Sequence, residues 1–289
     1  MFNKNYELIE DSPAVIEWDK YCNEVLREYK GLLQDYAKEE KEFQLFFEKN
    51  PSLIQGALEI FGHSGHYPFM NTLISQPKIG NIITRFPDFL WLAQDSLNFC
   101  PVFIEIESPA KKMFTTTGNT TAEFNHAMQQ IREWKNILKK PVNINLFYEY
   151  YNIPKEMQDK EFNPQFLLIF GRRSEYDNDE KLRGLRAENK LENVDIFSYD
   201  RLRPIYDFNQ FTCTTVKEAK YYIKSIPPTF RYRPSNADVL YKYKGFYEAI
   251  DNMEKTSDER IEFLKSRYEY WVNFGKSGCP GLIAVMDSE

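Results

Sequence analysis

The chain has few of the residues that build disulfide scaffolds or zinc sites. Its 289 residues include four cysteines and three histidines, and no two cysteines form a CxxC pair. Scattered single cysteines are typical of free thiols in a reducing compartment. No apolar run reaches the roughly 18 residues that a membrane span needs, and the opening MFNKNYELIEDSP lacks the features of a signal peptide. We therefore expect a cytoplasmic protein with no membrane partner.

Charge gives little information about a partner. The formal net charge is −6, and residues 1–60 account for it with 13 acidic and 7 basic side chains, whereas the rest carries 30 of each. A hydrophobic content of 42% and an aromatic content of 16% indicate a folded core. Composition therefore predicts a globular protein but neither favours nor excludes a polyanionic ligand.

Hydrophobic periodicity predicts an α/β protein around a mixed sheet. Helices are predicted over 14–47, 120–139 and 178–190, and the chain is mostly helical beyond Asp238. The helix from Thr120 opens with TTAE, a capping box, and has a regular apolar stripe. Strands are predicted near 79–84, in PDFLWLA and CPVFIEIES, and in VNINLFYEYY, FNPQFLLIFGRR and VDIFSYDRL. Helix, three strands, helix and strand thus follow one another in residues 30–150.

The stretch PVFIEIESPAKK places two carboxylates on an otherwise apolar strand. Side chains two apart on a strand share a face, so Glu105 and Glu107 face one way and Ile104 and Ile106 the other. If PDFLWLA and CPVFIEIES form a hairpin turning between Ser96 and Leu97, residues whose numbers sum to 193 lie opposite each other. Asp88 then faces Glu105, with Cβ atoms about 5 Å apart.

Glu40 is a further acidic candidate. It falls inside the helical stripe of Leu33, Tyr36, Ala37, Phe43 and Phe47. A carboxylate on a buried helix face needs a partner or a metal ion. Its neighbours Glu39 and Glu42 point elsewhere.

These acids predict a site for a hard divalent cation. Two carboxylates about 5 Å apart repel by about 3 kcal/mol at an effective dielectric constant near 20. Carboxylate oxygens without histidine or cysteine suit Mg²⁺ or Mn²⁺, and such ions activate water against phosphodiesters. An exposed hairpin face that is merely acidic is the alternative interpretation.

The order of these motifs resembles the PD-(D/E)XK nucleases, and most closely the Shedu family of anti-phage nuclease domains. Pro87-Asp88 is followed 17 residues later by the IEIE strand, and the resemblance includes EKEFQLFFEKNPSLI, HAMQQIREW and IFGRR through VDIFSYDRL. It covers about residues 35–205. It implies a restriction-endonuclease-like core, a helical extension in residues 1–34, and a mainly helical region in residues 206–289.

The resemblance also implies site residues. Asp88, Glu105 and Glu40 match the metal-binding acids, and Gln130 matches the glutamine of the following helix. One position departs from the family pattern, because Glu107 stands where the family usually has lysine. Glutamate there can act as a base or a metal ligand, but it cannot supply positive charge. Lys111 or Lys112 folding back is one way to supply it, although an ordinary solvated loop also explains these two lysines.

The implied function is a Mg²⁺- or Mn²⁺-dependent DNA endonuclease of anti-phage defence that forms a homo-oligomer. The alternatives are a catalytically impaired nuclease fold that binds nucleic acid or regulates, and a structural protein with an incidental acidic hairpin. The absence of the family's lysine at position 107 is the specific reason to consider the catalytically impaired alternative.

Several weaker signals have plain explanations beside the functional ones. His126 either lines the site or only lies on a helix face, and His63 and His66 in HSGH are read as loop residues. The arginines of GRR, with Arg183 and Arg186, could follow a phosphate backbone. They lie among acidic residues, which favours a self-neutralising surface.

Overall fold

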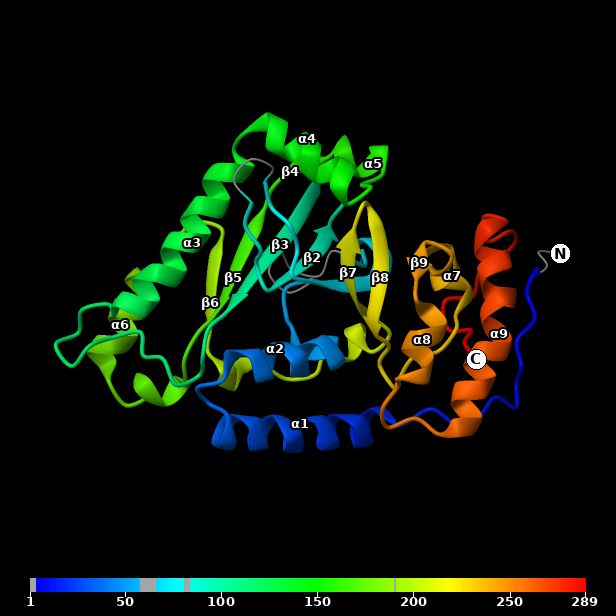
Figure 1. The fold of residues 1–289 in the computed structure, drawn as a ribbon, viewed down its shortest axis with the longest axis horizontal. Helices are drawn as coiled ribbons and strands as arrows, with labels where there is room; N and C mark the ends of the chain where they lie inside the picture. Colours follow the sequence, from blue (N-terminus) through cyan, green and yellow to red (C-terminus); the bar gives the residue numbers. More distant parts are fainter. Residues whose placement is uncertain (1–3, 58–65, 81–83, 190) are drawn as a thin grey trace.

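One mixed sheet forms the centre of the molecule. The computed structural model describes residues 4–57, 66–80, 84–189 and 191–289. Within these residues the strands follow the order β6-β5-β3-β2-β1-β7-β8-β9, and the short β4 pairs with β3 (Figure 1). The pairs β3–β5, β5–β6 and β1–β7 are parallel, whereas β1–β2, β2–β3 and β7–β8 are antiparallel. The α/β class predicted from the sequence is confirmed.

The strands are β1 (Thr72–Ser75), β2 (Phe89–Gln94), β3 (Asn98–Ile106), β4 (Glu161–Phe162), β5 (Gln165–Ile169), β6 (Val194–Phe197), β7 (Thr212–Lys217), β8 (Lys220–Ser225) and β9 (Tyr243–Lys244). The helices are α1 (Trp18–Asp35), α2 (Glu40–Lys49), α3 (Ala122–Leu138), α4 (Pro141–Tyr150), α5 (Lys155–Gln158), α6 (Glu180–Glu188), α7 (Ala237–Leu240), α8 (Phe246–Asp251) and α9 (Asp258–Lys276).

Helices cover both faces of the sheet, and the strands alternate accordingly. Phe43 and Phe47 of α2 pack with Phe89 and Ile104 in one core cluster. The other cluster joins the buried stripe of α3 to Leu90, Leu92 and Phe103. Ile104 and Ile106 therefore face α2, while Glu105 takes the face covered by α3, so these residues occupy opposite faces, as predicted.

The β2–β3 hairpin has the predicted register. Phe89 lies opposite Ile104 and Leu90 opposite Phe103, and both pairs of numbers sum to 193. The predicted stripe of α3 is also buried throughout. Its N-cap is Thr121, whose side chain accepts a hydrogen bond from the Phe124 N–H group, so the cap is one residue later than the predicted capping box.

The prediction of a strand in VNINLFYEYY is wrong, because these residues form α4. Pro141 occupies the first turn of the helix, where its missing N–H group has no cost. Val142 is 62% exposed, and only Phe147 of this helix is buried. The run is apolar in composition but lies on the surface, so its β-branched and aromatic residues do not decide the structure.

The prediction of a strand near residues 79–84 is also wrong for those of its residues that the structure describes. Ile79 makes only an isolated bridge with Arg85, and residues 81–83 lie outside the described residues. The first strand is instead β1, whose four residues are all buried. Four buried residues are too few to show a period of two.

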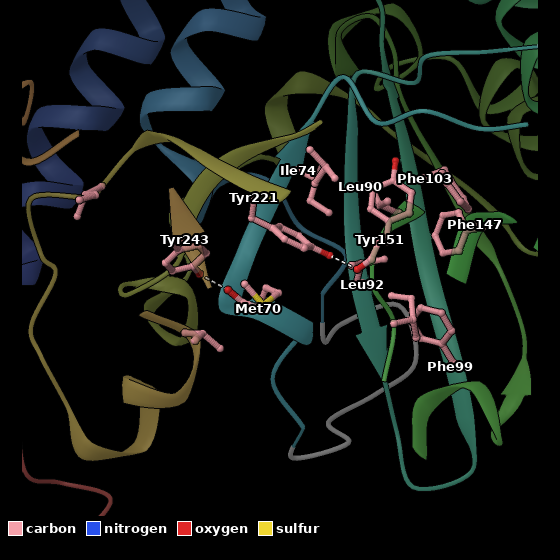
Figure 2. Packing of buried hydrophobic residues seen from close by; sticks show 14 of the residues in the cluster. Met70, Ile74, Leu90, Leu92, Phe99, Phe103, Phe147, Tyr151, Tyr221 and Tyr243 are labelled. Atoms are coloured by element: carbon pink, nitrogen blue, oxygen red, sulfur yellow. Dashed lines mark hydrogen bonds between the residues drawn. The ribbon is translucent and has the colours of Figure 1, made fainter. Parts of the chain in front are cut away.

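The segment after residue 205 extends the same sheet. β7 pairs with β1, and β8 and β9 follow beyond it. The Tyr221 hydroxyl of β8 donates to the main-chain oxygen of Tyr151 at 2.7 Å, and that of Tyr243 donates to the oxygen of Met70 (Figure 2). The predicted helical character of residues 206–289 holds for α7, α8 and α9, but the sheet runs across the proposed division at 205.

None of the described helices has the length and apolarity that a bilayer crossing requires.

Candidate functional site

Asp88 and Glu105 lie next to each other where β2 begins and β3 nears its end. The Asp88 N–H group donates to the Ile104 oxygen at 3.1 Å. A carboxylate oxygen of Asp88 accepts the Ile106 N–H group at 2.8 Å, which fixes the side chain against β3. Glu105 is 8% exposed, on the face that α3 covers. The hairpin thus brings the two acids together, as predicted.

Burial and mutual repulsion make this carboxyl pair hard to ionise. Desolvation is the largest cause of the raised pKa of Asp88, although the hydrogen bond from Ile106 opposes it. Desolvation also raises the pKa of Glu105, followed by the negative charges of Asp88, Glu107 and Glu40. A group of buried acids with raised pKa values is typical of sites that hold protons or cations.

Glu107 continues the line of acids beyond the end of β3. Its N–H group donates to the Ile169 oxygen of β5 at 2.9 Å, and its side chain is 7% exposed. The ammonium group of Lys111 forms an ion pair with this carboxylate. Desolvation lowers the pKa of Lys111, but the hydrogen bond and charge of Glu107, together with the charges of Glu40 and Glu123, raise it above its usual value. Positive charge therefore enters the site from the loop after β3.

Glu40 joins the cluster from the other side of the sheet edge. The Ser108 hydroxyl and the Ala110 N–H group donate to the Ala37 oxygen, at 2.6 and 3.0 Å, which anchors the start of α2 beside this loop. The Lys111 ammonium lies 3.9 Å from the Glu40 carboxylate. Desolvation, followed by the charge of Glu107, raises the pKa of Glu40.

The helical stripe that identified Glu40 is only partly correct. Glu40 is the first residue of α2, its side chain is 44% exposed, and Tyr36 in the same stripe is 48% exposed. A break between α1 and α2 separates the two halves of the stripe, so the pattern belongs to two helices and not to one.

Gln130 of α3 has a buried oxygen without a hydrogen-bond partner. Among the described residues, Gln130 Oε1 and Glu105 Oε2 are both buried acceptors that no group satisfies. A buried acceptor without a donor costs about 1–3 kcal/mol, so such atoms suit a site that binds a cation or water. His126 lies one turn before Gln130 and is exposed on the same helix.

The site suits a hard divalent ion that is held by two carboxylates and not one that is surrounded by protein ligands. No group of three or more histidine, cysteine, aspartate or glutamate side chains in the described ranges is arranged to hold a metal ion. Mg²⁺ often binds through one or two carboxylates and keeps several waters. Asp88 and Glu105 match that requirement, and the unsatisfied oxygen of Glu105 is available as a ligand.

The described contacts of the remaining sequence candidates are with residues other than the acids of this cluster, and one candidate lies outside the described residues. Lys112 is exposed, and its main-chain oxygen accepts a hydrogen bond from the Thr121 hydroxyl. His66 approaches the Ser96 hydroxyl at 3.4 Å, and His63 lies outside the described residues.

Sequence reasoning missed three residues that shape the site. Tyr199 is buried, its hydroxyl has no hydrogen-bond partner among the described residues, and Asp88, Glu40 and Glu107 all raise its pKa after desolvation. Glu175 accepts the N–H groups of Met113 and Phe114, at 2.9 and 2.8 Å, and so holds the loop after Lys111.

The third is Gly171. It has φ +62°, and a Cβ atom there would lie 2.7 Å from the Lys111 oxygen. Gly171 can be recognised in the sequence because it is a glycine, whereas no short-range pattern marks Tyr199 or Glu175.

The fold and the cluster together define a mixed α/β protein with an acidic site at the carboxyl end of the interior strand β3. The family described as "Shedu protein SduA, C-terminal" matches residues 37–203, and the chain belongs to this family. The match contains α2, the β2–β3 hairpin, α3, β5 and β6, and therefore every residue of the cluster. No curated protein matches the chain. Family membership supports a role in anti-phage defence.

Proposed function

We propose that this protein is a metal-dependent DNA endonuclease that hydrolyses phosphodiester bonds in anti-phage defence. The observation that carries the proposal is the pair of adjacent buried acids, Asp88 and Glu105, with the Lys111 ammonium held beside them by Glu107. Buried acids and a neighbouring cation are the groups that phosphodiester hydrolysis needs. DNA as the substrate follows from family resemblance and not from a basic surface.

The proposed metal is Mg²⁺ or Mn²⁺. Asp88 and Glu105 would hold it, with Glu40 at the outer margin of the site. When bound, the ion supplies Lewis acidity and lowers the pKa of a bound water.

The chain's own residues then have distinct roles. Glu107 holds Lys111, and Lys111 neutralises negative charge that develops on the phosphate. The free Oε1 of Gln130 accepts a hydrogen bond from the attacking water and orients it. In this arrangement Lys111 provides the charge that the family usually has at position 107, and Glu107 positions it.

A second candidate is a nucleic-acid-binding protein with the same fold and no cleavage activity. The ion pair between Glu107 and Lys111 favours it, because this pair neutralises the extra carboxylate without a metal ion. The two candidates differ in turnover and not in binding, so a cleavage assay separates them.

The test is the nicking of supercoiled plasmid in Mg²⁺ or Mn²⁺. We expect wild type to cleave, and Asp88→Asn and Glu105→Gln to lose at least about 10²-fold in rate, the scale on which removing one stabilising group acts. Glu156→Gln is the matched control, because Glu156 is exposed on α5. Equal cleavage by all four proteins would place the activity elsewhere, and no cleavage by wild type would favour the second candidate.

A further inference from the structure

A basic cavity lies at the same edge of the sheet as the carboxylate cluster. It has a volume of about 780 Å³, within the range of about 300–1,000 Å³ that is usual for small-ligand sites. Its walls come from the segment after β5, from α6 and from residues 198–208 after β6. Because β3, β5 and β6 are parallel, their carboxyl ends meet at one edge. Open α/β sheets commonly bind ligands there.

The charge of the cavity is opposite to that of the whole chain. Four arginines line it: Arg173, Arg186, Arg201 and Arg203. Asp200 and Asp207 are its only acidic lining residues among those described. Asp200 is already neutralised, because the Arg172 guanidinium binds it through Nε at 3.0 Å and Nη2 at 2.6 Å.

Two of the four arginines have no carboxylate partner within the described part of the chain. Arg203 is exposed and makes no side-chain hydrogen bond or ion pair there. Arg201 has none either, and its guanidinium lies 3.7 Å from the centre of the Phe197 ring, which holds it in place. Arginine presents paired N–H donors that match a phosphate. These two therefore form an available anion site.

The other two arginines are partly engaged. Arg173 lies 3.3 Å from Asp177, but both side chains are at least half exposed. Arg186 donates to the Ile196 oxygen and lies 4.8 Å from the centre of the Tyr176 ring. The self-neutralising surface predicted around GRR thus holds for Arg172 and Arg173 and not for the whole cavity.

The cavity also offers an aromatic surface. Tyr206 lines it and is 60% exposed. Trp18 contacts Tyr206 edge-on, with ring centroids 5.5 Å apart and an interplanar angle of 86°, so this contact leaves part of the Tyr206 ring open. Nucleic-acid bases stack on such rings without regard to sequence.

We propose that this cavity binds a nucleotide, with its phosphate on Arg201 and Arg203 and its base on Tyr206. The nucleotide belongs either to a free nucleoside phosphate or to a strand of nucleic acid. Buried Tyr199 connects the two sites, because its neighbour Asp200 lines the cavity and the charges of Asp88, Glu40 and Glu107 act on its hydroxyl. The inference goes beyond the proposed function, because it needs no cleavage at Asp88 and Glu105.

The test measures binding to the full chain in EDTA, so that no cleavage occurs. Three probes are titrated: dAMP, inorganic phosphate and a short labelled oligodeoxythymidine. We expect Arg203→Ala and Arg201→Ala each to weaken binding about tenfold, the scale of one charge-assisted hydrogen bond. Tyr206→Ala should weaken dAMP or the oligonucleotide but not phosphate, and Tyr206→Phe should restore it. Arg27→Ala, an exposed arginine of α1, is the matched control.

The outcomes distinguish a free nucleotide from a nucleic-acid strand, and the cavity from the carboxylate cluster. Binding of dAMP in preference to the oligonucleotide supports a free nucleotide, and the reverse preference supports a strand. Equal losses in Arg203→Ala and Arg27→Ala, or phosphate binding as tightly as both nucleotide probes, would overturn the proposal. Because binding is measured in EDTA, it does not depend on cleavage at the carboxylate cluster. Loss of the proposed nuclease activity with binding intact would therefore refute only the nuclease.

Discussion

Lys111 forms an ion pair with Glu107, four residues earlier in the chain, across the turn that ends β3. The same ammonium lies 3.9 Å from Glu40. One lysine therefore faces two acids of the cluster, and both contacts depend on the path of the loop from residue 108 to residue 111.

Removing the lysine should impair cleavage. We expect Lys111→Ala to lower the plasmid-nicking rate by about 10²-fold, because charge on the phosphate is then left without its ammonium partner. Lys112→Ala is the matched control, since Lys112 is adjacent in sequence and exposed. If both variants cleave at the wild-type rate, Lys111 has no catalytic part.

A lysine at position 107, where the family usually has one, should restore cleavage that Lys111→Ala loses. In the Lys111→Ala background, adding Glu107→Lys moves the ammonium onto the end of β3, where the family usually has it. We expect the double variant to recover at least about tenfold of the lost rate. Glu107→Gln alone should lower the rate by about 10²-fold, because Lys111 loses the group that positions it. A Glu107→Gln variant as active as wild type would contradict this role.

The acid pair should make the metal-free protein less stable as pH rises. The folded-state pKa values of Asp88 and Glu105 are raised, so the folded chain binds more protons than the unfolded chain above about pH 4. Stability then decreases from about pH 4 upward, through the range in which the folded pair ionises. Glu105→Gln should remove much of this dependence and increase the free energy of unfolding near pH 8 by about 1–3 kcal/mol.

Thermal melting in EDTA at a series of pH values measures this, with Glu156→Gln as the control. Added Mg²⁺ should raise the melting temperature of wild type more than that of Glu105→Gln. A Glu105→Gln variant that melts below wild type near pH 8 would show that the carboxyl group has a structural role.

Gly171 should be required for the position of Lys111. A Cβ atom at Gly171 would lie 2.7 Å from the Lys111 oxygen, at a φ of +62° that other residues rarely adopt. We expect Gly171→Ala to destabilise the fold by about 1–3 kcal/mol and to reduce cleavage. Gly184→Ala is the matched control, because no described atom outside the backbone of α6 lies within 4 Å of its Cβ position. Unchanged melting and cleavage in Gly171→Ala would refute this requirement.

Local patterns predicted the register of the β2–β3 hairpin and the buried face of α3 correctly. The hairpin register follows from where the turn lies, and a register error of one residue would have turned Glu105 to the other face. The stripe of α3 was equally clear, because six buried positions repeat at helical spacing.

The features that could not be predicted from the sequence depend on contacts between residues that are far apart in the chain. β1 has four residues and is defined by its parallel pairing with β7, about 140 positions later. Tyr199 reaches the cluster only because β6 lies beside β5. Glu175 holds the loop after Lys111 from more than 60 residues away. No local period records such pairings.

The pairing of β1 with β7 also limits how the protein can be divided. A fragment that stops at residue 203 keeps all the acids of the cluster but loses β7, so the edge of β1 from Thr72 to Ile74 is left without its neighbour. Unpaired strand edges recruit other chains. The excised fragment should therefore aggregate or exchange strands, and oligomers observed with it would report the missing strand and not the assembly of the intact protein.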